Sequence, residues 1–458
     1  MTDYRSRSLW LDGVPGELTP RPPLEGPADV DVAIVGAGYT GLWTAYYLKK
    51  ADPHLRIAVL EREIAGFGAS GRNGGWCSSF FAGSREATAK RHGREAAVAQ
   101  QRAMFETVDE IGRVVAEEDI DARYHKGGAL VQASNVPQLL RAQEEIEWER
   151  SWGFGEEDYR LLGAEEARSR IDATGSLGAF FTPHCACVDP ARLTRGLADV
   201  VERLGLPIYE RTPALSLSAG RVETPAGAVT AEVVVRATEG YTVELPGFER
   251  ALLPMYSLMI ATDPLPAATW DAIGWREHET FNDERFLIVY AMRTDDDRLA
   301  IGGRGAPYHW GSRVSDDFIR EPKVFEGLEG VVRQLFPQIG DFEVTHTWGG
   351  PIGIPRDWYS SVGLDRASGR AWAGGYVGDG VGTTNLAGRT LRDLILGNDT
   401  DLTGLPWVGH QSPLWEPEPL RWIAVNAAMK AMASADGYEE RTGRPSKRAT
   451  MVKKLIGA

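Results

Sequence analysis

The feature that most constrains this fold is a glycine-rich turn between an apolar strand and a helix near the start of the chain. Residues 31–35 form a short β-branched run, and Gly36-Ala-Gly38-Tyr-Thr-Gly41 follows it directly. Residues 40–50 are predicted to be a helix, and residues 57–60 a second strand. In a strand–turn–helix–strand unit, this G-x-G-x-x-G spacing is typical of a dinucleotide-binding fold.

Each glycine has a separate physical task in such a unit. Gly36 makes the turn, Gly38 lets backbone approach a pyrophosphate, and Gly41 lets the helix pack on the strand. The helix N-terminus offers unpaired N–H groups and a positive dipole to the phosphates. Glu61 ends the second strand about 20 residues beyond Gly41, where its carboxylate would accept hydrogen bonds from ribose hydroxyls. An acid at this place disfavours a 2′-phosphate, and therefore NADP.

Two further glycine clusters favour FAD over NAD. The segment GFGASGRNGG, residues 66–75, is a dense small-residue loop that suggests backbone passing close to a large planar ligand. The segment GGYVGDGVGTT, residues 374–384, ends one strand and opens a helix, so it supplies a second helix N-terminus suited to negative charge. One site for the ADP half and one for the flavin half explains why both ends of the chain are glycine-rich.

Composition limits the class of protein. The chain has 458 residues and a net charge of −14, which argues against a general nucleic-acid binder. No run reaches the length of a membrane-spanning helix, and the first ten residues lack the apolar core of a signal peptide. Three cysteines are too few for a disulfide framework, so a cytoplasmic location is expected. The sequence His184-Cys-Ala-Cys187 lacks a second ligand cluster at zinc spacing, so no metal centre is predicted.

The remaining pattern predicts alternating helical and strand-rich regions. Residues 86–150 are predicted to be helical, best at 104–116 and 136–152, and residues 246–345 to be rich in strands. Strands at 287–290 and 298–302 are expected to pair across the turn Asp295-Asp-Asp297. Shorter strands are expected at 208–209, 214–217, 222–224, 233–237, 342–347 and 370–373, with helices at 193–204, 326–336, 384–396 and 420–435.

Six elements in this order resemble the D-amino acid oxidase superfamily of flavoproteins. They are the first strand–helix–strand unit, GFGASGRNGG, Val188-Asp-Pro190, ATEGY at 237–241, TWGG at 347–350 and GGYVGDGVGTT. The second element is most similar to the γ-glutamylputrescine oxidase-like branch. The resemblance covers about residues 28–400 and implies an α/β fold, α+β overall. It implies a Rossmann-type FAD-binding domain, discontinuous in sequence, and a substrate domain built on a large mixed β-sheet.

The resemblance divides the chain into alternating parts. The FAD-binding domain is expected at 28–110, 181–245 and 346–400, and the substrate domain at 111–180 and 246–345. Residues 401–458 are expected to form a tryptophan-rich and helical tail. Oligomeric state stays open.

The resemblance also implies which residues contact the cofactor. The expected FAD-binding residues are Gly36, Gly38, Tyr39, Thr40, Gly41, Glu61, Arg62, Ala69, Ser70, Arg72, Asn73, Gly74, Ala214, Thr238, Gly240, Gly375, Gly378, Asp379, Gly380, Val381, Gly382 and Thr383. Some relatives attach flavin through a His in the loop after the second strand or a Cys near the second glycine cluster. Arg72 takes the first place and no Cys lies near Gly375, so non-covalent FAD is predicted. Relatives often carry His or Asn where Asp379 stands, which leaves its effect on the flavin open.

The implied reaction is oxidation of a C–N bond in a small amine or amino acid, with hydride transfer to flavin N5. The imine product would hydrolyse, and O₂ is the expected acceptor, giving H₂O₂. A dehydrogenase with another acceptor, or a tailoring enzyme for a larger natural-product amine, stays open.

Arg72 and Asn73 are the candidate flavin-edge residues, and Tyr256, Tyr290, Trp348 and Tyr376 the candidate substrate-cavity residues. Arg304 could pair with a substrate carboxylate, but a solvated strand-end arginine is the favoured interpretation, which shifts the expected substrate toward an amine.

Overall fold

The strand β1 (Ala28–Val35) occupies the centre of the first large sheet in the computed structural model, which describes residues 2–456. Strands β18, β11, β1, β2 and β8 run parallel, β17 pairs antiparallel at one edge, and a β9–β10 hairpin extends from β11. The bounds of the strands other than β1 are β2 (Ile57–Leu60), β8 (Ile208–Tyr209), β9 (Ser216–Ser218), β10 (Arg221–Thr224), β11 (Gly227–Arg236), β17 (Ser361–Asp365) and β18 (Arg370–Gly374).

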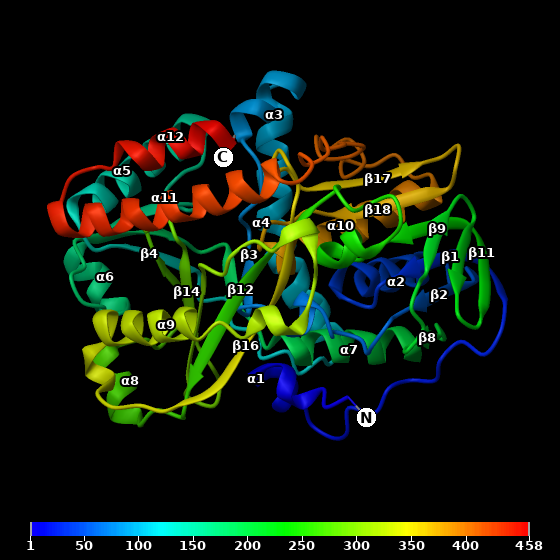
Figure 1. Ribbon diagram of the computed structural model, residues 1–458, viewed down its shortest axis with the longest axis horizontal. Coiled ribbons are helices and arrows are strands. Elements are labelled where there is room, and N and C mark those ends of the chain that lie inside the picture. Colours follow the sequence, from blue (N-terminus) through cyan, green and yellow to red (C-terminus); the bar gives the residue numbers. More distant parts are fainter. Residues whose placement is uncertain (1, 457–458) are drawn as a thin grey trace.

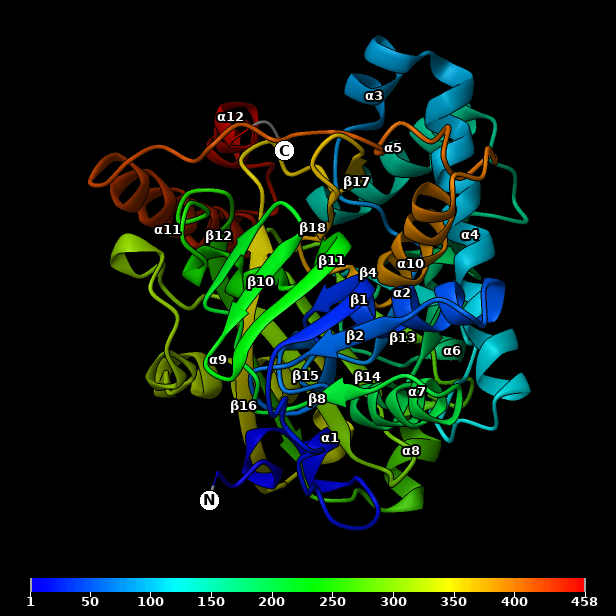
Figure 2. The ribbon, with the colours of Figure 1, turned by 90° about the vertical axis from the view of Figure 1, so that its right-hand side faces the viewer.

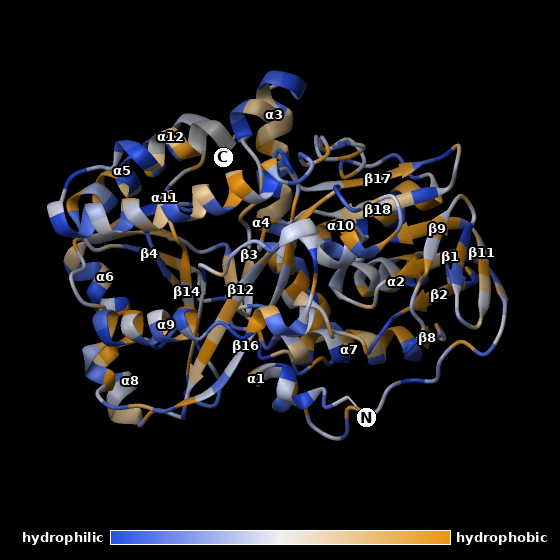
Figure 3. Cartoon of the chain, viewed as in Figure 1, coloured by the Kyte–Doolittle hydropathy of each residue, from blue (hydrophilic) through white to orange (hydrophobic). Residues whose placement is uncertain are grey.

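Alternating side chains of β1 enter two different cores, because successive residues of a strand point to opposite faces. Val32 and Ile34 pack beneath helices, whereas Ala33 and Val35 pack with Val222 of the hairpin. The helices over the first face are α2 (Tyr39–Ala51), α4 (Arg94–Glu117), α7 (Pro190–Arg203) and α10 (Gly380–Leu396). Figure 2 shows these helices gathered on one side of the sheet, and Figure 3 shows its apolar strands.

A second large sheet lies beside the first (Figure 1). It is mixed, because β13 and β4 are parallel and its other neighbouring strands are antiparallel. Its strands, in spatial order, are β16 (Val344–Ile354), β12 (Leu253–Thr262), β15 (Leu299–Arg304), β14 (Val289–Arg293), β13 (Thr280–Asp283), β4 (Ala129–Ala133), β6 (Gly178–Thr182) and β5 (Arg160–Gly163). A short pair, β3 (Trp76–Ser78) and β7 (Cys185–Cys187), forms a third sheet.

The other helices lie around these sheets. Figure 1 shows α11 and α12 at the edge of the second sheet, near α5, with α8 and α9 at its other end. Their bounds are α1 (Leu9–Asp12), α3 (Arg85–His92), α5 (Val136–Trp152), α6 (Ala164–Arg170), α8 (Ala267–Ile273), α9 (Pro322–Leu335), α11 (Leu420–Thr442) and α12 (Lys447–Ile456). Within residues 2–456, no helix has the length and apolar character needed to cross a membrane.

The predicted elements are largely present, with three differences. The region 86–150 is not helical throughout, because β4 interrupts it: its five residues are all buried and pair with β13 and β6. This partnership with distant segments overrides the local helical composition. The strand predicted at 214–217 is displaced to Ser216–Ser218, and helix α10 begins at Gly380, four residues before the predicted start. The paired strands around Asp295-Asp-Asp297 are confirmed.

The strands of each large sheet come from separated stretches of chain. The first sheet takes strands from 28–60, 208–236 and 361–374, and the second from 129–182 and 253–354. This interleaving is what a discontinuous fold requires, and the mixed second sheet is the architecture expected. The residue boundaries between the parts stay predictions.

Gly388 provides a test of the packing that holds α10 against α2. A Cβ at Gly388 would lie 2.7 Å from Trp43 Cβ and 2.8 Å from its carbonyl carbon. We expect Gly388→Ala to lower the free energy of unfolding by about 1–3 kcal/mol, because a packed interface cannot give way cheaply. Gly330→Ala is the control at an exposed position of α9, where no atom lies within 4 Å, and should be neutral or stabilising. Urea unfolding of both variants checks this, and equal stability would contradict it.

Candidate functional site

A cavity of about 410 Å³ opens at the carboxyl ends of β1, β2 and β11. The N-terminal ends of α2 and α10 reach it from one side, and the loop after β2 from another. Sixteen of the predicted residues line it: Gly36, Gly38, Tyr39, Thr40, Glu61, Arg62, Ala69, Ser70, Asn73, Ala214, Thr238, Gly240, Tyr376, Gly378, Gly380 and Val381. The structure therefore brings together segments that are more than 300 residues apart in the sequence.

The glycine-rich turn is shaped so that only glycine fits at two places. Gly36 has φ +109°, and a Cβ there would lie 2.4 Å from the carbonyl oxygen of Ala237. A Cβ at Gly41 would lie 1.9 Å from the carbonyl oxygen of Gly36. Gly38 is the N-cap of α2 and provides no side-chain cap. The N-terminus of α2 is thus held close to β1, with its dipole directed at the cavity.

Glu61 has its carboxylate held in place by backbone groups. Its Oε2 accepts a hydrogen bond from the N–H of Ala37 at 2.9 Å, and its Oε1 accepts one from the N–H of Glu63 at 2.9 Å. Burial raises the pKa of Glu61, and these two bonds partly offset that shift. Each oxygen keeps a second lone pair, so the group can accept further hydrogen bonds from hydroxyls in the cavity.

The N-terminus of α10 is a second anion-favouring end on the same cavity. Its N-cap is Asp379, yet the carboxylate makes no cap hydrogen bond. It accepts instead from Ser78 Oγ at 3.0 Å. Gly378 and Gly380 on either side of it line the cavity, so the first N–H groups of α10 stay available to a ligand.

Arg304 is not the solvated strand-end residue that the sequence favoured. Its Nη2 donates to the carbonyl of Val377 at 2.7 Å, and lies 3.4 Å from where a Cβ on Gly378 would be. Burial lowers the pKa of Arg304 and raises that of Asp379 to about 6, and their mutual attraction opposes both shifts. The guanidinium therefore attracts the carboxylate electrostatically.

Arg72 and Asn73 lie in the loop before β3. Asn73 lines the cavity, and its side-chain amide donates to the carbonyls of Ala69 and Ser70. Arg72 is buried beside the cavity and donates to the carbonyl of Gly349 at 3.2 Å and to Tyr241 Oη at 2.6 Å. Its cation therefore ties this loop to the second sheet.

The other predicted cofactor residues support the cavity from behind. Thr383 Oγ1 donates to the Asp379 carbonyl at 2.6 Å. A Cβ at Gly74 or Gly382 would clash respectively with Tyr290 or with the carbonyl of Ser78, and Gly375 has φ +75° with Pro355 close to it. These glycines thus allow close packing of the surrounding segments.

The four aromatic candidates for the substrate cavity separate in space. Tyr376 lines the cavity, and its hydroxyl lies 2.8 Å from Thr40 Oγ1. Tyr290 covers Gly74 and Gly302, and its hydroxyl lies 2.7 Å from Ser257 Oγ.

The remaining two aromatics lie in cores. Trp348 is buried against Trp10 and donates to the carbonyl of Arg72 at 3.0 Å. Tyr256 packs on Phe318 and bonds with the backbone of Ser315, so the structure does not bring it to Tyr290. Tyr256 and Ser257 are neighbours on β12 and therefore point to opposite faces.

Glu239 is a cavity residue that the sequence analysis did not single out. Its carboxylate accepts from the N–H of Gly353 at 2.6 Å and from that of Tyr376 at 3.2 Å, joining three distant segments. Burial raises its pKa to about 7, although these backbone bonds and nearby Arg236 act to lower it. The signal lay within the quoted segment ATEGY, but nothing in the sequence indicated that its acid would be buried.

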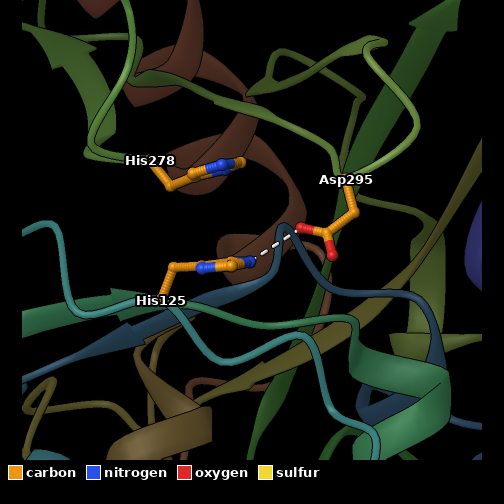
Figure 4. A group of neighbouring side chains, drawn as sticks. All are labelled: His125, His278 and Asp295. Carbon is orange, nitrogen blue, oxygen red and sulfur yellow. Dashed lines mark hydrogen bonds and ion pairs between the residues drawn. The ribbon is translucent and has the colours of Figure 1, made fainter.

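A separate cluster of His125, His278 and Asp295 offers three ligand atoms within 4.8 Å of one another. Figure 4 shows the two imidazole rings stacked face to face, with a hydrogen bond from His125 to Asp295. The ring centroids are 4.2 Å apart, and His125 Nε2 lies 2.8 Å from Asp295 Oδ1. Because imidazole lone pairs lie in the ring plane, two stacked rings do not direct theirs at one point. This cluster shares no lining residue with the large cavity and was also missed from the sequence.

The fold and cavity together define a dinucleotide-binding oxidoreductase of the flavoprotein class: a parallel sheet, a glycine turn, and two helix N-termini on one cavity. Residues 31–394 match the family of FAD dependent oxidoreductases, and the chain belongs to this family. FAD, bound without a covalent link, is therefore its cofactor. The cavity fits this group, because both Glu61 and the open α10 N-terminus line it.

Individual relatives agree with this assignment. The chain is 30% identical to gamma-glutamylputrescine oxidoreductase of Escherichia coli over 80% of this chain and 84% of that protein. It is 28% identical to the probable oxidoreductase OrdL of Haemophilus influenzae over 83% of this chain and 86% of that protein. The structure of glycine oxidase from Geobacillus kaustophilus superimposes with a TM-score of 0.69 at 21% identity, covering 84% of this chain and 99% of that one.

The raised pKa of Glu239 predicts a pH dependence of stability in the FAD-free protein. The folded state binds this proton more tightly than the unfolded state, so the contribution is full below about 4.5 and is lost as pH rises through about 7. We expect Glu239→Gln to flatten the fall in unfolding free energy between these pH values, by a few kcal/mol at most. Urea titrations at several pH values measure it. A variant with the wild-type slope would contradict the assignment.

Proposed function

We propose that this chain oxidises a C–N bond in a small amine or amino acid, using FAD as the hydride acceptor and O₂ as the final acceptor. The observation that carries the proposal is the open N-terminus of α10, set beside Asp379, Arg304 and Tyr290. The names of the relatives, gamma-glutamylputrescine oxidoreductase and glycine oxidase, support this substrate class. The imine product would hydrolyse to a carbonyl compound, and H₂O₂ would be the second product.

In this proposal, the two ends of the cavity hold the two halves of FAD. Glu61 accepts from the adenosine ribose, and the α2 N-terminus with Gly38 faces the pyrophosphate. The α10 N-terminus at Gly380 faces the pyrimidine end of the flavin, where a positive dipole favours negative charge. Arg72, in the loop between β2 and β3, adds a buried cation beside the cavity.

When bound, the flavin supplies the two-electron oxidising chemistry, and the protein orients and polarises. Tyr290 and Tyr376 are proposed to border the substrate, whereas Tyr256 and Trp348 act as core residues that hold the second sheet. Arg304 is proposed to set the charge of the cavity rather than to clamp a carboxylate, because its Nη2 already donates to the carbonyl of Val377 and Asp379 attracts it. The substrate is a small molecule, and the reducing cytoplasm suits three buried, unpaired cysteines.

The visible spectrum of the purified protein tests this function. We expect the two absorption bands of flavin, and their full release into solution after acid precipitation. Anaerobic addition of an amine panel, including γ-glutamylputrescine, glycine and sarcosine, should bleach the blue band with at least one member. Oxygen uptake on readmitting air separates an oxidase from a dehydrogenase. A flavoprotein that no member of the amine panel bleaches would overturn the proposed reaction.

Glu61→Gln tests the proposed ribose contact. A neutral amide replaces a charge-assisted acceptor, so the FAD dissociation constant should rise about tenfold or more. Fluorescence quenching during titration of the FAD-free protein with FAD measures this. Glu63→Gln is the matched control: this neighbour accepts from Tyr4 and does not line the cavity. If both variants bind FAD with equal affinity, the proposed contact between Glu61 and the ribose is wrong.

A further inference from the structure

Asp379 occupies a position where an aspartate normally caps a helix, yet it does not cap. An N-cap aspartate ordinarily accepts hydrogen bonds from the second or third N–H of its helix. In α10 no such bond forms, and the carboxylate turns to Ser78 Oγ on β3, 3.0 Å away. By contrast, Asp189 at the N-cap of α7 accepts from the N–H of Arg192 at 2.9 Å. The carboxylate of Asp379 therefore makes no hydrogen bond to its own helix, and a lone pair on it is available to a ligand.

The surroundings of Asp379 keep it both accessible and ionisable. Its neighbours Gly378 and Gly380 line the flavin cavity, and Asp379 itself is partly accessible. The groups that face it from the packed elements are Ser78 of β3, Arg304 of β15 and the buried thiol of Cys185 on β7. Ser78 and Arg304 both favour the carboxylate form, whereas burial opposes it.

An amine substrate needs such a group. Alkyl amines have pKa values near 10, so nearly all of the substrate is an ammonium ion at pH 7. An ammonium ion has no lone pair with which to assist the departure of a hydride from its α-carbon. A base beside the cavity therefore removes a barrier that the fold and cofactor leave in place.

We propose that Asp379 is the catalytic base that deprotonates the substrate ammonium before oxidation. An N–H bond of the ammonium breaks, its proton moves to a carboxylate oxygen of Asp379, and the electron pair stays on nitrogen. The products of the step are a neutral amine and a carboxylic acid, with no change in oxidation state. Ser78 orients the carboxylate, and Arg304 keeps it ionised. This role rests on the proposed oxidation of an amine.

The test compares wild type with Asp379→Asn in anaerobic flavin reduction across pH 5 to 10.5. The measured quantity is kred/Kd, the rate constant of flavin reduction divided by the dissociation constant of the amine. For an alkyl amine, the wild-type kred/Kd should be level from about pH 6.5 to 9. The variant should depend on free amine alone, so its kred/Kd should be roughly 10³-fold lower at pH 7 and approach wild type near pH 10. With an amine that carries electron-withdrawing β-fluorines and has a pKa near 7, the kred/Kd of the variant at pH 7 should lie within about tenfold of the wild-type value. Asp379→Glu should restore part of the level region.

Two further measurements separate a chemical role from a structural one. FAD content and thermal midpoint should match wild type in Asp379→Asn. Asp189→Asn is the control, because burial raises the pKa of Asp189 to about 6, as for Asp379, but Asp189 caps its helix and neither of its chain neighbours lines the flavin cavity. Its pH profile should equal wild type. If Asp379→Asn keeps the wild-type profile, or loses the same rate at every pH, the base assignment is overturned. If no amine bleaches the wild-type flavin, the proposed function fails instead.

Discussion

The contact between the backbones of Gly36 and Gly41 is the constraint on which the site depends. No side chain fits at either place, because a Cβ on Gly41 would overlap the Gly36 carbonyl. That closeness sets α2 directly against β1. The strand β1 lies in the middle of the sheet, and its two neighbours, β2 and β11, run parallel to it. Three strands then end at one edge, and the open end of α2 faces the same space. The cavity follows from the approach of two glycines.

Charge in this cavity is arranged by burial more than by ion pairing. Glu61, Glu239 and Asp379 are three acids around one site, and burial raises the pKa of each. Two helix N-termini, Arg72, Arg236 and Arg304 provide the opposing positive potential. A bound anionic dinucleotide would meet dipoles and backbone N–H groups, which are fixed before it arrives. The acids differ in how they are held: Glu61 and Glu239 bond to backbone, whereas Asp379 bonds to a hydroxyl.

The sequence predicted the first strand–helix–strand unit well because every signal there is local. Within that unit, β2 matches the predicted range, and the glycine spacing predicted residues that line the cavity. Outside the unit, α5 also matches its predicted range. β4 was missed because its pairing with β13 joins residues about 150 positions apart, and composition carries no trace of that partner. Glu239 was missed for a related reason, since its carboxylate is buried only when Gly353 and Tyr376 arrive from later in the chain.

The same distinction explains why substrate-contacting residues are harder to predict from the sequence than cofactor-contacting residues. Cofactor-contacting residues obey rules of backbone shape, so glycines mark them in the sequence. Substrate-contacting residues obey rules of side-chain direction, which a sequence does not record: Tyr256 and Ser257 are neighbours, yet only Ser257 meets Tyr290. Arg304 follows this logic too. Its position suggested a solvent-facing strand end, but its guanidinium donates to the carbonyl of Val377, in the loop before α10, and Asp379 attracts it. A nearby aspartate weakens the attraction of this arginine for a substrate carboxylate, and this agrees with the proposed preference for an amine.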